Sequence, residues 1–100
     1  MNAPRFRHLR DDDKLAVVVR PNRLSVAKPF SSPAVLAELR EDFAGDVVAE
    51  LSAGEIREAA RNGKRTVKPV TLAGVSVDWV AACDAAERVN GFLVPDGGAQ

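Results

Sequence analysis

The sequence is poor in the residue types from which most catalytic and metal sites are built. It contains one cysteine, one histidine and no tyrosine among 100 residues. A single cysteine excludes an internal disulfide framework and a zinc site with four cysteine ligands. The longest apolar run, residues 15–19, is far too short to cross a membrane and lacks the cleavage site of a signal peptide. We therefore expect no membrane association and a cytoplasmic location.

An excess of one charge sign is also missing, because 14 basic residues balance 14 acidic ones. The balance hides an asymmetry: residues 1–30 carry seven basic and three acidic side chains, whereas residues 31–60 carry two basic and seven acidic ones. Opposite charge blocks either form two solvated faces or bias which partners dock. Apolar residues make up 46% of the chain, which at this length predicts one globular domain with a single core.

The chain ends are expected to lie outside that domain. Residues 1–14 have little hydrophobic pattern, so we expect a mobile N-terminal arm, then a single domain over residues 15–95 and a flexible tail over residues 96–100. The arm mixes basic and apolar side chains before three aspartates cancel most of its charge. This composition favours either an arm that binds a specific protein partner or a plain solvated terminus, and the candidate contact residues are Arg5, Phe6, Arg7, Leu9 and Arg10.

The domain is expected to begin with a β-hairpin. Residues 15–20 are rich in β-branched side chains, and residues 23–26 alternate polar and apolar types with the period of a strand. Between them, Pro21 presets the backbone angle of a tight turn and Asn22 tolerates the position that follows.

A central helical segment is expected after the hairpin. Ser32 followed by Pro33 is typical of a helix start. Gly45 either divides the segment into two helices or is tolerated within one. The segment is predicted from apolar residues that recur at spacings of three and four, which places them on one helical face: Leu36, Leu39, Phe43, Val47 and Leu51.

A further helix and a second hairpin are expected next. Ser52 and Glu55 form the pattern of a capping box, which predicts a helix that ends at the Asn-Gly pair of residues 62–63. Residues 70–72 and 75–77 are short β-branched runs on either side of Ala-Gly, which suggests a tight hairpin.

The last part of the chain leaves an alternative open. Asp78 as a cap and the alanine-rich residues 79–89 favour a C-terminal helix, whereas a strand continuing through residue 83 is the alternative. Residues 92–94 predict a short last strand. The fold class is therefore α+β: two β-hairpins around a central helical segment, then a helix or strand. The expected core is Leu15, Val17, Val19, Leu24, Val26, Leu36, Leu39, Phe43, Val47, Leu51, Ile56, Val70, Leu72, Val77, Trp79, Val80, Cys83 and Phe92.

No group of residues predicts catalysis, a cofactor or a metal. His8 lies in the expected arm, where nothing rigid orients it, and Cys83 falls on an apolar helical stripe typical of a buried structural thiol. Ser32 and Ser52 are explained as helix caps. The acidic residues of the middle segment share a helical face without converging ligands, which is typical of a solvated surface: Glu38, Glu41, Asp42, Asp46 and Glu50. We expect no enzyme and infer no small-molecule substrate.

Residues 73–76 (Ala-Gly-Val-Ser), followed by Val80, resemble the turn and the start of the recognition helix in helix-turn-helix repressors. The resemblance implies DNA binding, with a first helix over about residues 66–72. The sequence departs from the family there, because Pro69 removes a helical hydrogen bond and Val70 stands where the family has a very small residue.

A basic patch is independent of that motif. Four cations occur within eight residues with no acidic residue between them, which suits contact with phosphates or with the acidic face of a protein. Cations near a helix C-terminus also stabilise the helix dipole, which is the alternative explanation. The patch residues are Arg61, Lys64, Arg65 and Lys68.

Residues 70–77, with Asp84 and the later Phe-Leu-Val of residues 92–94, resemble small proteins encoded among phage head and tail genes. That resemblance implies a connector, decoration or assembly role, a place in a virion, and a strand over residues 79–83. The sequence thus predicts a non-catalytic protein–protein interaction module, an adaptor or a structural component that binds a protein partner or itself. The alternative is a small nucleic-acid-binding regulator that uses the basic patch.

Overall fold

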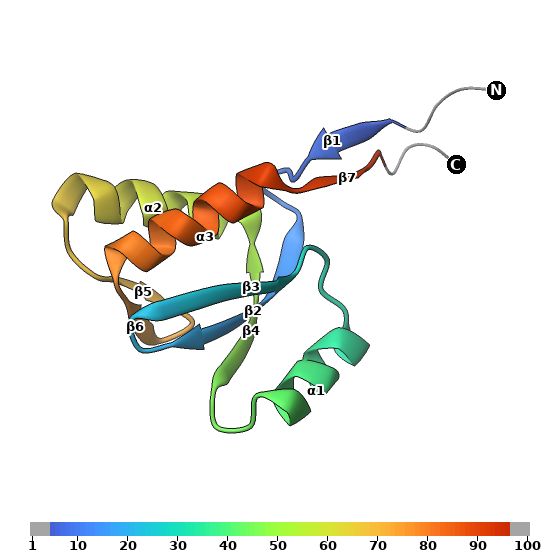
Figure 1. The fold of residues 1–100 in the computed structure, drawn as a ribbon, viewed down its shortest axis with the longest axis horizontal. Helices are drawn as coiled ribbons and strands as arrows, with labels where there is room; N and C mark the ends of the chain where they lie inside the picture. Colours follow the sequence, from blue (N-terminus) through green and yellow to red (C-terminus); the bar gives the residue numbers. More distant parts are fainter. Residues whose placement is uncertain (1–4, 97–100) are drawn as a thin grey trace.

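The computed structural model describes residues 5–96, and within that range the chain forms an α+β fold with antiparallel sheets (Figure 1). The elements in chain order are β1 (Phe6–His8), β2 (Lys14–Arg20), β3 (Arg23–Lys28), α1 (Pro33–Asp42), β4 (Val47–Ser52), α2 (Ala53–Thr66), β5 (Val70–Leu72), β6 (Val75–Val77), α3 (Trp79–Gly91) and β7 (Leu93–Pro95).

The central sheet has the strand order β3-β2-β4, and β2 pairs antiparallel with both neighbours. The first hairpin is confirmed: Pro21 and Asn22 form its turn, and Asn22 adopts a positive φ of 61°. Side chains at alternate positions of β2 point to opposite faces of the sheet. Because all residues from Leu15 to Val19 are buried, both faces of this strand are covered.

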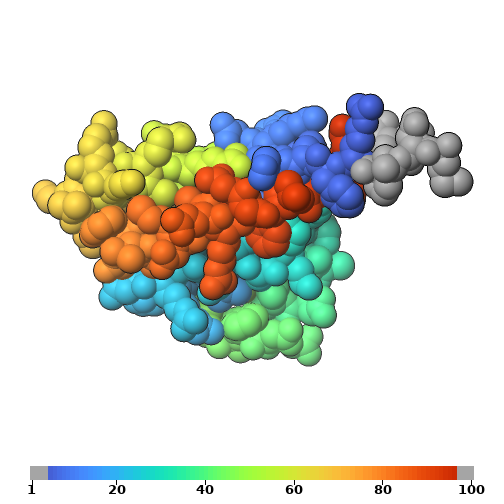
Figure 2. Space-filling view, turned by 45° about the horizontal axis from the view of Figure 1, so that its top comes forward, coloured from blue at the N-terminus to red at the C-terminus, as the bar shows by residue number. Residues whose placement is uncertain are grey.

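Helices α2 and α3 lie together against one face of the sheet, whereas α1 lies on the other side and contacts β4 and β2 (Figure 1). The main core forms between the sheet and the helix pair, and Figure 2 shows the two helices side by side. Its fully buried large side chains are Leu15, Val17, Val19, Ile56, Val77 and Val89. At the C-terminal end of α1 (its C-cap is Phe43), Arg20 lies over the ring of Phe43 at 5.6 Å and pairs with Asp46.

The three helix starts lie where the sequence places them. The hydroxyl oxygens of Ser32 and Ser52 accept hydrogen bonds from the backbone N–H groups three residues later, each at 3.1 Å. The carboxylate of Asp78 accepts one from the N–H of Val80 at 2.8 Å. Each cap satisfies a donor that the first helical turn would otherwise leave unpaired.

Part of the predicted helical segment is wrong, because residues 47–52 form strand β4 rather than a helical face. Helix α1 ends at Asp42, and Gly45 in the following turn has a φ of +94° that a helix does not allow. A spacing of four residues also keeps two side chains on the same face of a strand. Leu51 therefore faces the core from a strand, whereas Val47, predicted to be buried, is 39% exposed.

The predicted end of the second helix at residues 62–63 is also wrong, because α2 continues to Thr66. Gly63 is not a cap: it is buried in the helix, where an added Cβ would stand 2.7 Å from Cβ of Trp79. The helix ends instead at Val67, which adopts the left-handed conformation with a φ of 49°. Gly63 thus permits close approach of α3.

The second hairpin is confirmed, and the resemblance to a helix-turn-helix motif is not supported. Residues 70–72, the second half of its expected first helix, are strand β5, and residues 75–77 are strand β6. Ala73 and Gly74 both have positive φ, which is the geometry of a tight hairpin turn. The helical alternative for residues 79–89 is confirmed by α3, so the strand implied by the phage resemblance is absent there. Val80, expected in the core, is 48% exposed.

Residues 5–14 differ from the expected mobile arm because they are packed against the domain. Strand β1 pairs antiparallel with β7, and Leu9 is 3% exposed within the main core. The carbonyl oxygens of Asp11 and Asp13 accept hydrogen bonds from the N–H groups of Gly54 and Ala53. Of the expected tail, the N–H of residue 96 donates to the carbonyl oxygen of Arg5, just before β1, and residues 1–4 and 97–100 lie outside the described range.

Candidate functional site

The β1–β7 ribbon brings the two ends of the described chain together and projects from one end of the domain (Figure 1). The register pairs Phe6 with Pro95 and His8 with Leu93, so these four side chains share one face. All four are exposed, and Phe6 and Leu93 are each 58% exposed. The opposite face, which includes Val94, packs inward. We call the exposed face the ribbon face.

The ribbon also has an open edge. The N–H of Asp96 donates to the carbonyl oxygen of Arg5 at 2.9 Å, which fixes the phase of the antiparallel ladder. Because bonded and non-bonded pairs alternate, the backbone N–H and C=O groups of Phe6 and His8 point away from β7. Among the described residues, no other strand pairs with β1. The C=O of His8 accepts a hydrogen bond from the Arg7 guanidinium, and the N–H and C=O of Phe6 and the N–H of His8 remain to pair with a further strand.

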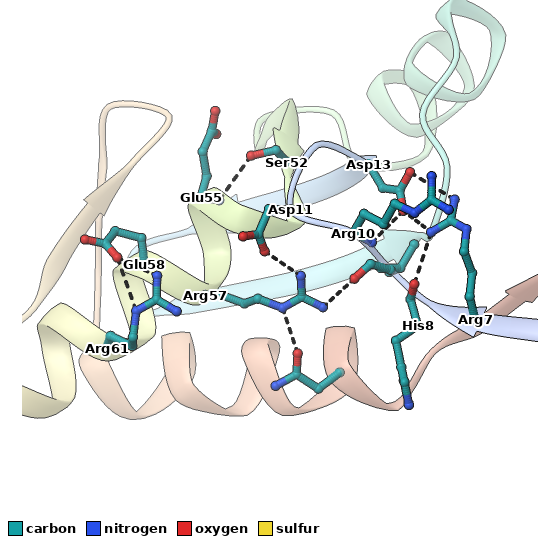
Figure 3. Close-up of polar contacts among 12 residues, drawn as sticks. Arg7, His8, Arg10, Asp11, Asp13, Ser52, Glu55, Arg57, Glu58 and Arg61 are labelled. Carbon is teal, nitrogen blue, oxygen red and sulfur yellow. Dashed lines mark hydrogen bonds and ion pairs between the residues drawn. The ribbon is translucent and has the colours of Figure 1, made fainter.

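Polar contacts hold the base of the ribbon in place (Figure 3). The guanidinium of Arg7 donates to both carboxylate oxygens of Asp13, at 2.7 and 3.3 Å, and to the carbonyl oxygen of His8 at 3.0 Å. The N–H of Arg10 also donates to Asp13 at 2.7 Å. The hydrogen bonds from Arg7, opposed by partial burial, hold the pKa of Asp13 below its ordinary value of 3.8.

The predicted partner-binding residues therefore divide into two groups. Arg5, Phe6 and Arg10 are exposed, whereas Leu9 belongs to the core and Arg7 is committed to its ion pair. Sequence reasoning missed Leu93 and Pro95, which complete the ribbon face. Residues 92–94 were expected to form a strand, but no local pattern identifies β1 as its partner.

The predicted basic patch is exposed along the second half of α2 and the turn that follows it. Arg61 is paired with Glu58 at 2.6 Å, and Arg65 donates to the side-chain oxygen of Asn62 at 2.7 Å. Lys64 and Lys68 make no ion pair with the described residues. The patch is thus solvent-facing, with two of its four cations engaged along the helix.

The two groups considered for chemistry lie on different elements, His8 on β1 and Cys83 on α3. His8 is exposed on the ribbon face, and Cys83 is half-buried between α3 and α2, with its sulfur 3.7 Å from the carbonyl oxygen of Ala60. Within residues 5–96 there is no group of three or more His, Cys, Asp or Glu side chains placed to hold a metal ion. In the same range, no helix has the length and hydropathy of a membrane span.

No protein-family model, curated protein sequence or solved structure matches the chain.

Proposed function

We propose that this chain is a non-catalytic protein–protein interaction module, a structural component of a larger assembly, and that the ribbon face is its contact surface. The observation that carries the proposal is the exposure of Phe6 and Leu93, 58% each, on a ribbon that also has an open strand edge. Large apolar side chains gathered on one exposed face favour burial against a partner.

In a two-stranded ribbon, each strand has a hydrogen-bonded neighbour on one edge only. Isolated two-stranded ribbons are marginally stable in water, and a third strand on the open edge adds backbone hydrogen bonds while its side chains cover one face. Phe6 is the aromatic anchor typical of such interfaces. Arg5 and Arg10, exposed on either side of β1, favour a partner strand that carries carboxylates. The expected partner is thus the edge strand of another protein, in the cytoplasm or in a virion.

Site-specific photocrosslinking tests this proposal in the cells from which the protein comes. A photoreactive phenylalanine analogue replaces Phe6, and the same analogue replaces Val80 as the control. Val80 is 48% exposed but lies in the first turn of α3, at the other end of that helix from β7. A defined crosslinked polypeptide at position 6 that is absent at position 80, and that disappears with Leu93→Asp, is the expected result. Equal crosslinking at both positions contradicts the proposal.

A second candidate function follows from the exposure of all four basic-patch residues. Duplex DNA of random sequence binds such a patch through its phosphates, with an affinity that falls steeply as salt rises. The test is labelled-DNA anisotropy over a salt series, with Lys64→Glu and Arg65→Glu together as the variant. Loss of binding to every sequence supports a nucleic-acid-binding regulator. Absence of binding at low salt removes this candidate and leaves the ribbon proposal untouched.

A further inference from the structure

A hollow of about 390 Å³ lies between α2 and α3, on a different part of the domain from the ribbon face. Its size falls within the range of roughly 300 to 1,000 Å³ found for small-molecule sites. The helices run antiparallel, so the end of α2 and the start of α3 border the same part of the hollow. The residues that matter for its chemistry are Ala60, Arg61, Lys64, Trp79, Cys83 and Glu87.

One wall of the hollow is apolar and includes an aromatic ring. Trp79, half-buried at the first position of α3, lies against Gly63 of α2. Because Gly63 has no side chain, α3 approaches α2 closely there, and both Trp79 and the residue after Gly63, Lys64, border the hollow. Ala60 and Cys83 extend the apolar wall. A flat ring that enters the hollow finds an aromatic surface to stack on.

The rim of the hollow is cationic, with three basic side chains and one carboxylate. The guanidinium of Arg57 is already satisfied, since its nitrogens donate to Asn90, Asp11 and the carbonyl oxygen of Leu9 (Figure 3). Arg61 shares its charge with Glu58. Lys64 makes no ion pair with any described residue, so its ammonium group is available to an incoming anion.

We propose that this hollow binds a small organic anion that carries a planar ring, with the ring against Trp79 and the phosphate or carboxylate at Lys64 and Arg61. The larger hollow on the other side of α2, about 750 Å³, is bordered by Glu55 and Glu58 and repels such a ligand. The proposal is independent of the ribbon face. It gives Lys64 a different ligand from the nucleic acid of the second candidate function.

Trp79 is the single tryptophan of the chain, so its fluorescence reports occupancy directly. The probes are phenyl phosphate, which has both a ring and an anion, inorganic phosphate, which lacks the ring, and phenol, which lacks the anion. We expect a saturable change with phenyl phosphate at concentrations at least tenfold lower than either partial probe requires. The two contacts act together only when one molecule makes both.

Charge-matched variants locate the binding. Lys64→Gln, on an exposed side chain that the fold does not use, is expected to weaken phenyl phosphate binding roughly three- to tenfold through loss of a charge-assisted contact. Lys68→Gln removes the same charge four residues on, outside the hollow, and is expected to leave the affinity unchanged. Circular dichroism confirms that both variants fold.

Three results overturn the proposal. The first is the absence of saturable binding of phenyl phosphate to the wild-type protein. The second is equal weakening by Lys64→Gln and Lys68→Gln, which assigns the anion to the general field of the basic patch. The third is that short duplex DNA displaces phenyl phosphate from the protein and that Lys64→Gln and Lys68→Gln weaken DNA binding equally, which makes the basic patch a nucleic-acid surface.

Discussion

Replacement of Gly63 by alanine tests the packing between α2 and α3, which forms the main core together with the sheet. An added Cβ would stand 2.7 Å from Cβ of Trp79, about 0.7 Å inside the 3.4 Å at which ordinary contact begins. Two more atoms, Cα of Trp79 and Cγ1 of Val70, would lie at 3.3 Å. The nearest atom is one that every residue except glycine possesses, so no rotation of the indole relieves the clash and the helices must separate.

The magnitude is a balance of two opposing effects. Alanine in a helix interior is about 1 kcal/mol more favourable than glycine. Overpacking a close contact costs about 1–3 kcal/mol because the neighbouring backbone has to move. At Gly63 the obstructing atoms include main chain, so we expect the strain to exceed the gain and the free energy of unfolding to fall by about 1 kcal/mol. For a domain of this size that lowers Tm by roughly 4–8 °C.

The matched control is Gly91→Ala at the end of α3, where an added Cβ meets no atom of residues 5–96 within 4 Å. The same chemical change is there expected to raise the free energy of unfolding by up to about 0.5–1 kcal/mol, because only the helix preference acts. Urea unfolding followed by circular dichroism measures both variants. If Gly63→Ala stabilises the protein as much as Gly91→Ala does, α3 does not approach α2 as closely as described and the reasoning is refuted.

Three further predictions concern other contacts. Leu9→Ala is expected to lower the free energy of unfolding by about 2–5 kcal/mol, because the Leu9 side chain is buried in the core. Phe6→Ala, at an exposed side chain, is expected to change it by less than about 1 kcal/mol. Near-zero changes for both variants in urea unfolding would mean that residues 5–14 form the expected mobile arm. Asp13→Asn is expected to destabilise the protein at neutral pH, where the charged carboxylate is paired with Arg7. The difference from wild type is fully present above pH 3.8 and is lost as the pH falls through the lowered pKa of folded Asp13, because the carboxylate then becomes protonated. A difference that persists unchanged in acid contradicts the role of the ion pair. Val67→Gly removes the backbone strain of a β-branched residue with a φ of 49° and is expected to raise Tm, measured by calorimetry, by roughly 4–8 °C. A lower Tm would count against backbone strain at this position.

Features decided by neighbouring residues were predictable from the sequence. The caps at Ser32, Ser52 and Asp78 and the turns at Asn22 and Gly74 each depend on bonds or backbone angles within about four residues. Residue identity predicts such local features, because few side chains satisfy a helix start or tolerate a positive φ. These positions fix where most helices and hairpins begin and turn.

Features that depend on residues distant in the sequence were not predictable from it. Val47 and Leu51 are four positions apart, which is one helical turn and also two strand repeats, so periodicity alone does not distinguish the two. The choice is made by β2, which pairs with all of β4 from 30 or so positions earlier in the chain. The helix end predicted at Gly63 was wrong for a related reason. Gly63 is a close contact between helices because Trp79 packs against it, and the helix ends instead at Val67.

The candidate site shows the same division. The exposed Phe6 and the basic patch were identified from composition, yet the ribbon face exists only because β1 meets β7, and Leu93 and Pro95 follow from that pairing. No short-range signal links the two ends of a chain. The acidic run after β1 was expected to lie in a mobile arm that binds a partner or is simply solvated, but Asp13 binds Arg7 and turns the chain into β2.

Arg57 explains why the ribbon has a fixed position relative to the helix pair. Its three nitrogens bind Asn90 of α3, the carboxylate of Asp11 and the carbonyl oxygen of Leu9, at 2.7 to 2.8 Å, so one side chain joins α2, α3 and the segment that leads out of β1. A guanidinium supplies donors on three separate nitrogens, whereas the donors of a lysine all lie on one nitrogen. Because Arg57 also borders the hollow between the helices, its commitment to the ribbon segment leaves Lys64 and Arg61 as the cations that meet a ligand there. The two proposed surfaces are thus held by one residue without sharing a binding group, and a variant at either surface can be interpreted separately from the other.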